Sequence, residues 1–208
     1  MRYVILIFAF LFFITELDAY TVFDNCKWQG HKKNEMIDLY WIDKGYPCFY
    51  KAETIVDGKY YDDIIGILTN FEKYPEVFSG TIKFDVLEKK DNVFLIYCLI
   101  NFFPLKNRDY LINAKYNEDT DDKNLKSWTL LWYPTGNGYN AGKVLNDKFK
   151  HVKKVNGRWT VRMLDDNKLK ISVEYHNDWE VDANKDIKIS IEKTATVNAL
   201  KNLLKHLD

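Results

Sequence analysis

The segment FFPLKNRDYLI, residues 102–112, decides how the rest of the sequence is interpreted. A proline turn leads into an Arg-Asp pair, and the pair begins an apolar run, RDYLINAKY. Successive side chains of a strand point to opposite faces, so Arg108 shares a face with Tyr110 and Ile112, while Asp109 lies on the other. Burying an unpaired charge costs several kcal/mol. Arg108 is therefore either a strand-end residue that reaches water or a carboxylate, or a polar contact inside whatever the sheet encloses.

Further strands are predicted on both sides of this segment. Hydrophobic residues make up 47% of the chain and aromatic residues 16%, which favours a large core rich in sheet. Runs of apolar or alternating residues, bounded by turn signals, predict the other strands at 36–43, 48–55, 81–88, 93–103, 126–133, 149–155, 158–164 and 168–179. The Asn156-Gly157 dipeptide predicts a two-residue hairpin between the strands at 149–155 and 158–164.

Two segments have helical periodicity. Apolar residues recur every three or four positions in 58–78, and a long helix is predicted near the C-terminus, with Asp182 or Asn184 as its cap. Small and weakly polar residues occupy the first half of that helix, and leucines occupy the second. The order of elements predicts an α+β protein, in which an antiparallel sheet of about seven to nine strands packs against a long terminal helix.

The N-terminal residues resemble a secretory leader. A single Arg precedes an apolar run at residues 3–14, which is shorter than the roughly 20 residues that span a bilayer. We expect a signal peptide at 1–19, an N-terminal arm at 20–37 and one domain at 38–208, with an uncleaved anchor as the alternative to the signal peptide. In an oxidising compartment Cys26 and Cys48 would form a disulfide, the alternative being three reduced thiols. Cys98 is expected to be a small buried hydrophobe.

Composition and motifs argue against several functions. Lys and Arg number 30, equal to Asp and Glu, and no basic stripe is interleaved with aromatics, so nucleic-acid binding is not expected. The four histidines have no metal-ligand spacing, and nucleophile-elbow, Walker and dinucleotide motifs are absent from the sequence. We therefore expect no catalytic residues, no metal and no cofactor. The inward tryptophans of several strands either fill a core or line a cavity.

From about Asp38 to its end, the chain resembles a START domain, a lipid-binding branch of the helix-grip (Bet v 1-like) superfamily. The resemblance rests on an ordered set of features: a strand before a helix at 50–56, DVLEKKDN at 85–92, Pro104 followed by Arg108-Asp109-Tyr110, GRWTVRMLDDNKLKISVEYHNDWE at 157–180, and ALKNLLKHL at 199–207. Two features depart from the family. WEVDANKD at 179–186 replaces a Gly-Gly or Pro turn before the last helix. Lys83 or a neighbour stands where some sterol-type members place an acidic residue opposite the arginine, which leaves the lipid class open.

The resemblance implies a helix-grip fold, with a curved antiparallel sheet around the long C-terminal helix and one lipid or other hydrophobic molecule between them. The loop at 134–147 and the first half of the helix would gate this cavity. The residues expected to contact the ligand are Arg108, Tyr110, Phe102, Trp128, Trp132, Trp159, Met163, Tyr175, Thr194 and Val197.

The expected function is therefore to bind and carry or transfer a lipid, as a secreted or periplasmic monomer that contacts membranes transiently. The first alternative is a cyclase-like or hydrolase-like enzyme on the same fold, because one fold hosts many functions. The second is an interaction module with a filled core, for which a cavity below about 300 Å³ would be diagnostic.

Overall fold

This computed structural model describes residues 23–24, 26–34, 36–42, 48–102, 105–135 and 144–207. The predicted leader at 1–19, the residues between the predicted strands at 36–43 and 48–55, and most of the predicted gate loop, at 136–143, lie outside the described residues. Within these ranges, no helix is both long enough and apolar enough to cross a membrane.

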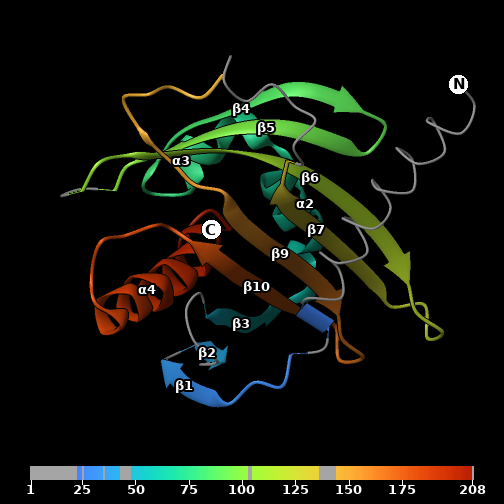
Figure 1. Ribbon diagram of the computed structural model, residues 1–208. Helices are drawn as coiled ribbons and strands as arrows, with labels where there is room; N and C mark the ends of the chain where they lie inside the picture. Colours follow the sequence, from blue (N-terminus) through green and yellow to red (C-terminus); the bar gives the residue numbers. More distant parts are fainter. Residues whose placement is uncertain are drawn as a thin grey trace, which may run out of the picture.

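The strands form one ten-stranded, strongly curved sheet, as Figure 1 shows. They are β1 (Gly30–Asn34), β2 (Ile37–Ile42), β3 (Phe49–Asp57), β4 (Thr81–Lys90), β5 (Val93–Ile100), β6 (Arg108–Thr120), β7 (Lys126–Pro134), β8 (Lys150–His151), β9 (Lys154–Met163) and β10 (Lys168–Asp178). Their order is β1-β2-β3-β10-β9-β7-β6-β5-β4, with antiparallel neighbours, and β8 pairs with β6 in parallel. β1 comes from the predicted arm and extends the sheet beyond β2.

The helical segments lie between β3 and β4 and at the C-terminus. They are η1 (Gly58–Tyr60), α2 (Tyr61–Thr69), η2 (Phe71–Lys73), α3 (Tyr74–Val77) and α4 (Lys185–Leu204). In α2 the buried side chains are Tyr61, Ile64 and Leu68, the three- and four-residue spacing that predicted a helix. The side-chain oxygen of Asn184 accepts a hydrogen bond from the Ile187 amide (3.0 Å), which confirms Asn184 as the N-cap of α4.

The main core lies on the concave face of the sheet, where the helices pack. α4 contacts β3, β10 and β2, whereas α3 contacts β4 and α2 contacts β9. Figure 1 shows α4 at the lower left of the sheet, with α2 and α3 behind the strands. Leu200 and Leu203, in the last turns of α4, are fully buried, so the helix is held mainly by its C-terminal half. An α+β sheet with a gripping terminal helix was the predicted architecture, and it is confirmed.

The predicted hairpin at Asn156-Gly157 is wrong, because β9 continues through both residues. Gly157 pairs with Trp132 of β7, and a Cβ atom at Gly157 would lie 1.9 Å from a carbon of the Trp132 ring. The glycine therefore makes room for an indole that lies flat on the strand. Asn-Gly is usually a local turn signal. Here the glycine is instead required by packing against a neighbouring strand.

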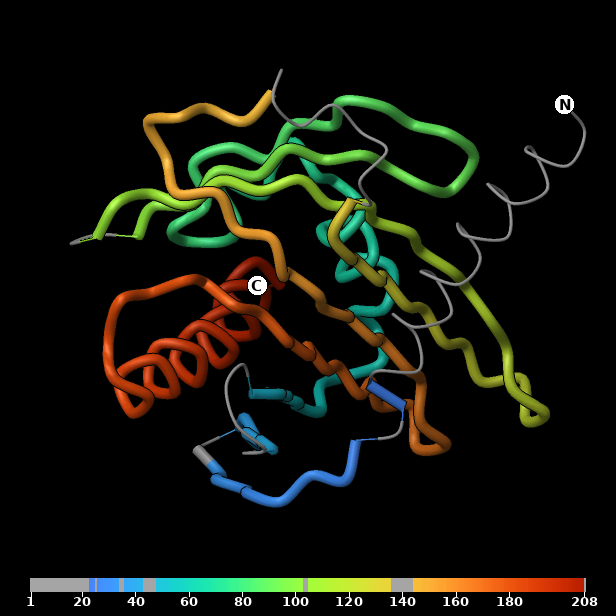
Figure 2. Tube along the Cα trace, viewed as in Figure 1, coloured from blue at the N-terminus to red at the C-terminus, as the bar shows by residue number. Residues whose placement is uncertain are grey.

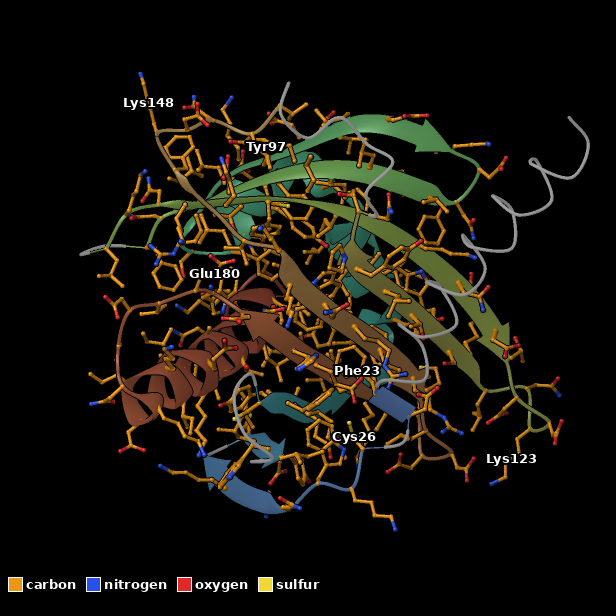
Figure 3. All side chains as sticks on the ribbon, viewed as in Figure 1. Phe23, Cys26, Tyr97, Lys123, Lys148 and Glu180 are labelled. Atoms are coloured by element: carbon orange, nitrogen blue, oxygen red, sulfur yellow. The ribbon has the colours of Figure 1, made fainter. Side chains whose placement is uncertain are left out.

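The convex face is covered at two places. Phe23 packs on Leu131 and Tyr133, and Figure 3 labels it beside the strands. The segment from 144 to 151 runs over β5 and β6, as the trace in Figure 2 shows, and β8 at its end pairs with the start of β6. Asp109 is fully buried beneath this segment and bonds the His151 ring through Nδ1 (2.5 Å) and the Asn146 amide (3.1 Å).

Candidate ligand cavity

A cavity of about 490 Å³ lies between the concave face of the sheet, the η2–α3 segment and α4. Its sheet wall is built from inward residues of β4, β5, β6, β7, β9 and β10, and most of them are aromatic or aliphatic. The aromatic lining residues are Phe71, Tyr74, Phe78, Phe84, Phe102, Tyr110, Trp132, Trp159, Tyr175 and Trp179. A concave, mostly apolar site with a few polar groups is the usual form of a small-molecule site.

The α4 side of the cavity is made of small residues. Five of these residues follow one another at intervals of one, three or four positions, which keeps them on one face of the helix. They are Ser190, Thr194, Ala195, Asn198 and Ala199. Side chains of this size do not reach the aromatic wall across from them, whereas the leucines of the next turns do pack into the core. The change from small residues to leucines along α4 therefore creates the space, as its sequence pattern suggested.

Two polar side chains face the cavity with an oxygen that has no hydrogen-bond partner among the described residues. They are Oε1 of Glu192, on α4, and Oδ1 of Asn177, on β10. Each residue is only 2% exposed. An unsatisfied buried oxygen costs roughly 1–3 kcal/mol, so a pair of them at one cavity is unusual for a site that serves packing alone.

Burial and, to a smaller extent, the nearby Asp178 raise the pKa of the Glu192 carboxyl to about 8. The indole N–H of Trp179 donates to the Glu192 carboxylate and opposes this shift, but it does not overcome it. Lys, Arg and His are missing from the described lining residues. The carboxyl therefore keeps its proton at neutral pH, and the cavity is uncharged.

Tyrosine hydroxyls form a second polar group at the cavity. The Tyr74 hydroxyl donates to the Leu68 carbonyl (2.7 Å), and Tyr110 forms a hydrogen bond with the Cys98 thiol. Burial raises the pKa of Tyr74, Tyr110 and Tyr175, and the Glu192 carboxyl raises that of Tyr175 further. Cys98 is fully buried, as predicted, and burial likewise raises its pKa. Every titratable group here favours its neutral form.

Six of the ten predicted contact residues line the cavity: Phe102, Tyr110, Trp132, Trp159, Tyr175 and Thr194. The other four do not. Trp128 is buried but stacks on Tyr116, and Met163 and Val197 pack on the core outside the lining. Strand parity correctly placed Trp128 and Met163 on the inward face of the sheet. It did not show that their positions along the strands lie beyond the cavity.

Arg108 is the fourth of these residues, and it lies beside the cavity rather than in its wall. Its side chain is 4% exposed, its guanidinium carbon lies 4.5 Å from the centre of the Phe102 ring, and its Nε donates to the Trp179 carbonyl (3.3 Å). A second nitrogen donates to the Lys106 carbonyl. Burial lowers its pKa, and Glu180 partly offsets this. The parity argument for a buried arginine holds, but the lining residues Phe102 and Trp179 lie between Arg108 and the cavity.

The described residues add no metal site to this picture. In the described ranges, no group of three His, Cys, Asp or Glu residues is placed to hold a metal ion. Cys48 is buried and Cys26 partly buried, and the Cys26–Cys48 disulfide stays a prediction.

Sequence reasoning missed Glu192, Asn177 and Trp179. Extending the inward set of β10 by two-residue steps from Tyr175 reaches Asn177 and then Trp179, so strand parity contained the signal for both. Glu192 lies three and four positions before Ala195 and Thr196, on the inward stripe of α4. A lone carboxylate on that stripe was the available clue.

No family model and no curated protein matches the sequence. The fold, in contrast, is similar to that of several solved structures. The human StarD13 (DLC2) lipid transfer and protein localization domain superposes with a TM-score of 0.71 at 11% identity, covering 94% of this chain and 96% of that one. A STAR-related lipid transfer protein from Xanthomonas axonopodis gives 0.69 at 16% identity, covering 86% and 98%. Human STARD10 gives 0.69 at 12%, covering 88% and 74%.

The chain has the START helix-grip fold. The segment between β10 and α4, WEVDANKD, contains neither glycine nor proline. The backbone of Glu180 in this turn adopts the left-handed conformation (φ 50°). The Glu180 amide donates to Asp178 Oδ1 (3.1 Å), and the Glu180 carboxylate pairs with Lys150 (3.2 Å). Figure 3 labels Glu180 in this turn, between β10 and α4. One hydrogen bond and one ion pair therefore hold this connection, where the resemblance led us to expect a Gly-Gly or Pro turn.

Proposed function

We propose that this protein binds one lipid or other hydrophobic molecule in the cavity and carries or transfers it. The observation that carries the proposal is the cavity of about 490 Å³, with an aromatic sheet wall and small α4 residues opposite. It falls within the range of about 300–1,000 Å³ that is usual for ligand sites, above the size expected of a filled core. Enclosing an apolar ligand there would contribute roughly 25 cal/mol for each Å² removed from water.

Binding is favoured over catalysis by the direction of the pKa shifts. Acid–base catalysis uses pairs of groups whose surroundings move their pKa values apart. Here burial raises the pKa of Glu192, of the three cavity tyrosines and of Cys98 alike, so no base is paired with the buried acid in the described lining. The solved structures of the same fold that are named for lipid transfer point the same way.

The remaining parts of the proposal rest on the sequence. The leader at 1–19 would direct the protein to the secreted or periplasmic compartment, where it would act as a monomer with transient membrane contact. The first half of α4 and the loop at 134–147 would open to admit the ligand.

Native mass spectrometry of protein purified from its own host, followed by solvent extraction, tests the proposal. We expect a monomer of the mass that follows cleavage after Ala19, with one copurifying hydrophobic molecule. Quenching of the cavity tryptophans, Trp132, Trp159 and Trp179, should report rebinding to the extracted protein. Absence of any bound hydrophobe, together with failure of a lipid panel to bind, would refute the proposal.

A further inference from the structure

We propose that Glu192 and Asn177 form a polar subsite that selects a ligand with an uncharged hydroxyl head over the corresponding anion. The inference rests on the proposed function and adds the chemical class of the ligand. Both residues line the cavity, both are almost fully buried, and each has an oxygen without a hydrogen-bond partner among the described residues. They come from facing elements, Glu192 from α4 and Asn177 from β10.

The chemistry of the pair favours a hydroxyl. An amide oxygen only accepts a hydrogen bond, whereas a protonated carboxyl both donates and accepts. A hydroxyl group donates one bond and accepts others, so it can donate to Oδ1 of Asn177 and bond the carboxyl at Oε1 of Glu192. A site built to hydrogen-bond a hydroxyl discriminates strongly against analogues that lack it, because its own polar groups would stay unpaired.

The electrostatics of the cavity disfavour charged heads. No cationic side chain belongs to the described lining, so a carboxylate or phosphate would be buried without a counterion. Arg108 does not supply one, since carbonyl groups hold its guanidinium and Phe102 covers it. A protonated amine would have to ionise Glu192, whose carboxyl favours its neutral form because of burial and Asp178.

Three of the polar side chains that line the cavity already have other partners. The Trp179 indole N–H bonds the Glu192 carboxyl, and the hydroxyls of Tyr74 and Tyr110 bond Leu68 and Cys98. The small face of α4 next to Glu192, at Ala195 and Ala199, leaves room for the ligand beside the carboxyl. The two oxygens are therefore best explained as ligand contacts.

A set of probes that differ only in the head group tests the subsite. Dodecanol, dodecane, dodecanoate and dodecylamine are titrated into delipidated full-length protein at pH 7, with quenching of the cavity tryptophans as the readout. We expect dodecanol to bind at least ten-fold more tightly than dodecane or dodecanoate. Equal affinity for dodecanol and dodecane, or tighter binding of dodecanoate or dodecylamine, would overturn the subsite while leaving hydrophobic binding intact.

Variants locate the selectivity in the two residues. Glu192→Met, which keeps the length of the side chain, and Asn177→Leu should each lose the dodecanol preference by about ten-fold but still bind dodecane. Glu192→Gln should retain most of the preference, because an amide also donates and accepts. Asp186→Asn is the matched control, since Asp186 lies on α4 but is exposed and outside the lining.

The outcomes separate the two proposals. Circular dichroism melts first confirm that each variant is folded. If Glu192→Met and Asn177→Leu keep the preference for dodecanol, the subsite is refuted. If no probe binds even the natural sequence, the proposed function itself fails, and the subsite fails with it.

Discussion

Two of the glutamates that the structure describes are buried, and their surroundings differ completely. Glu174, 5% exposed on the convex face, binds Arg158 through Oε2 and Nε (2.5 Å), and Arg158 also binds Asp24. Burial raises the Glu174 pKa, and the Arg158 charge opposes the shift. Glu192, 2% exposed on the concave side, receives a hydrogen bond from an indole but has no cation beside it in the described cavity.

The difference separates a structural carboxylate from one that is left for a ligand. A buried charge with a bonded counterion keeps β9 and β10 in register, since Arg158 and Glu174 are cross-strand neighbours. A buried carboxyl with an unpartnered oxygen instead lowers the stability of the free protein. If this distinction is correct, substitutions at the two sites should have opposite effects on stability.

The largest effect is expected from Arg158→Met. Removing the arginine leaves the Glu174 charge buried without its hydrogen-bonded partner, with only the more distant charge of Lys51 nearby, and breaking a buried pair in this way costs about 3–5 kcal/mol. Urea denaturation at pH 7 should show this loss of unfolding free energy. Arg162→Met is the control, because Arg162 lies on the same strand but is mostly exposed, so solvent screens its pair with Asp121 and the substitution should change stability little. Equal losses for the two variants would contradict the structural role of Glu174.

An intermediate effect on the unfolding free energy is expected from Glu192→Gln, and this effect should depend on pH. The Glu192 pKa is raised from its ordinary value of 4.5 to about 8 in the folded protein. Between these two values the unfolded chain releases the proton and the folded chain keeps it. The contribution of Glu192 to the unfolding free energy therefore falls as pH rises, by about 1.4 kcal/mol for each pH unit.

Glu192→Gln should remove this contribution. Relative to the natural sequence, the variant should gain about 3 kcal/mol between pH 5.5 and 7.5 in denaturant titrations. The difference between the two proteins should be constant below pH 4.5, where the carboxyl is protonated in both states. Asp186→Asn should follow the natural sequence throughout. A variant that runs parallel to the natural sequence across the whole range would show that Glu192 is not a neutral buried acid.

The smallest effect is expected from Arg108→Met, which tests a third buried charge. The Arg108 guanidinium is satisfied by the carbonyls of Lys106 and Trp179 rather than by a bonded carboxylate. Its removal should cost about 1–3 kcal/mol in urea denaturation, and the dodecanol preference should persist. Lys106→Met, an exposed substitution that keeps the backbone carbonyl, is the control. A loss of head-group selectivity in Arg108→Met would place Arg108 at the ligand after all.

Much of the fold followed from periodicity, and less of the cavity did. Strand parity correctly gave the inward faces, because two-residue alternation is a local property of the chain. It did not give depth along a strand, so it could not show that Phe102 and Trp179 cover Arg108. The Asn156-Gly157 dipeptide misled for a related reason, since the requirement for glycine comes from an indole on another strand.

A single sequence likewise does not show how a helix is rotated about its own axis relative to the sheet. The small residues of α4 were compatible with a filled core or with a cavity, and the structure has a cavity. Whether Glu192 faces that space or the solvent depends on a small rotation of the helix, which long-range packing at Leu200 and Leu203 fixes.

The uneven packing of α4 has a thermodynamic consequence. Leucines anchor its last turns, while small side chains leave its first half with less buried apolar area. A ligand that fills this space completes the core, so it binds the folded state and not the unfolded one. Stability then depends on ligand concentration through mass action, rising by about 2.7 kcal/mol at one hundred times the dissociation constant. If the proposed function is correct, folding and ligand binding are linked, and the amount of folded protein would report how much ligand its surroundings supply.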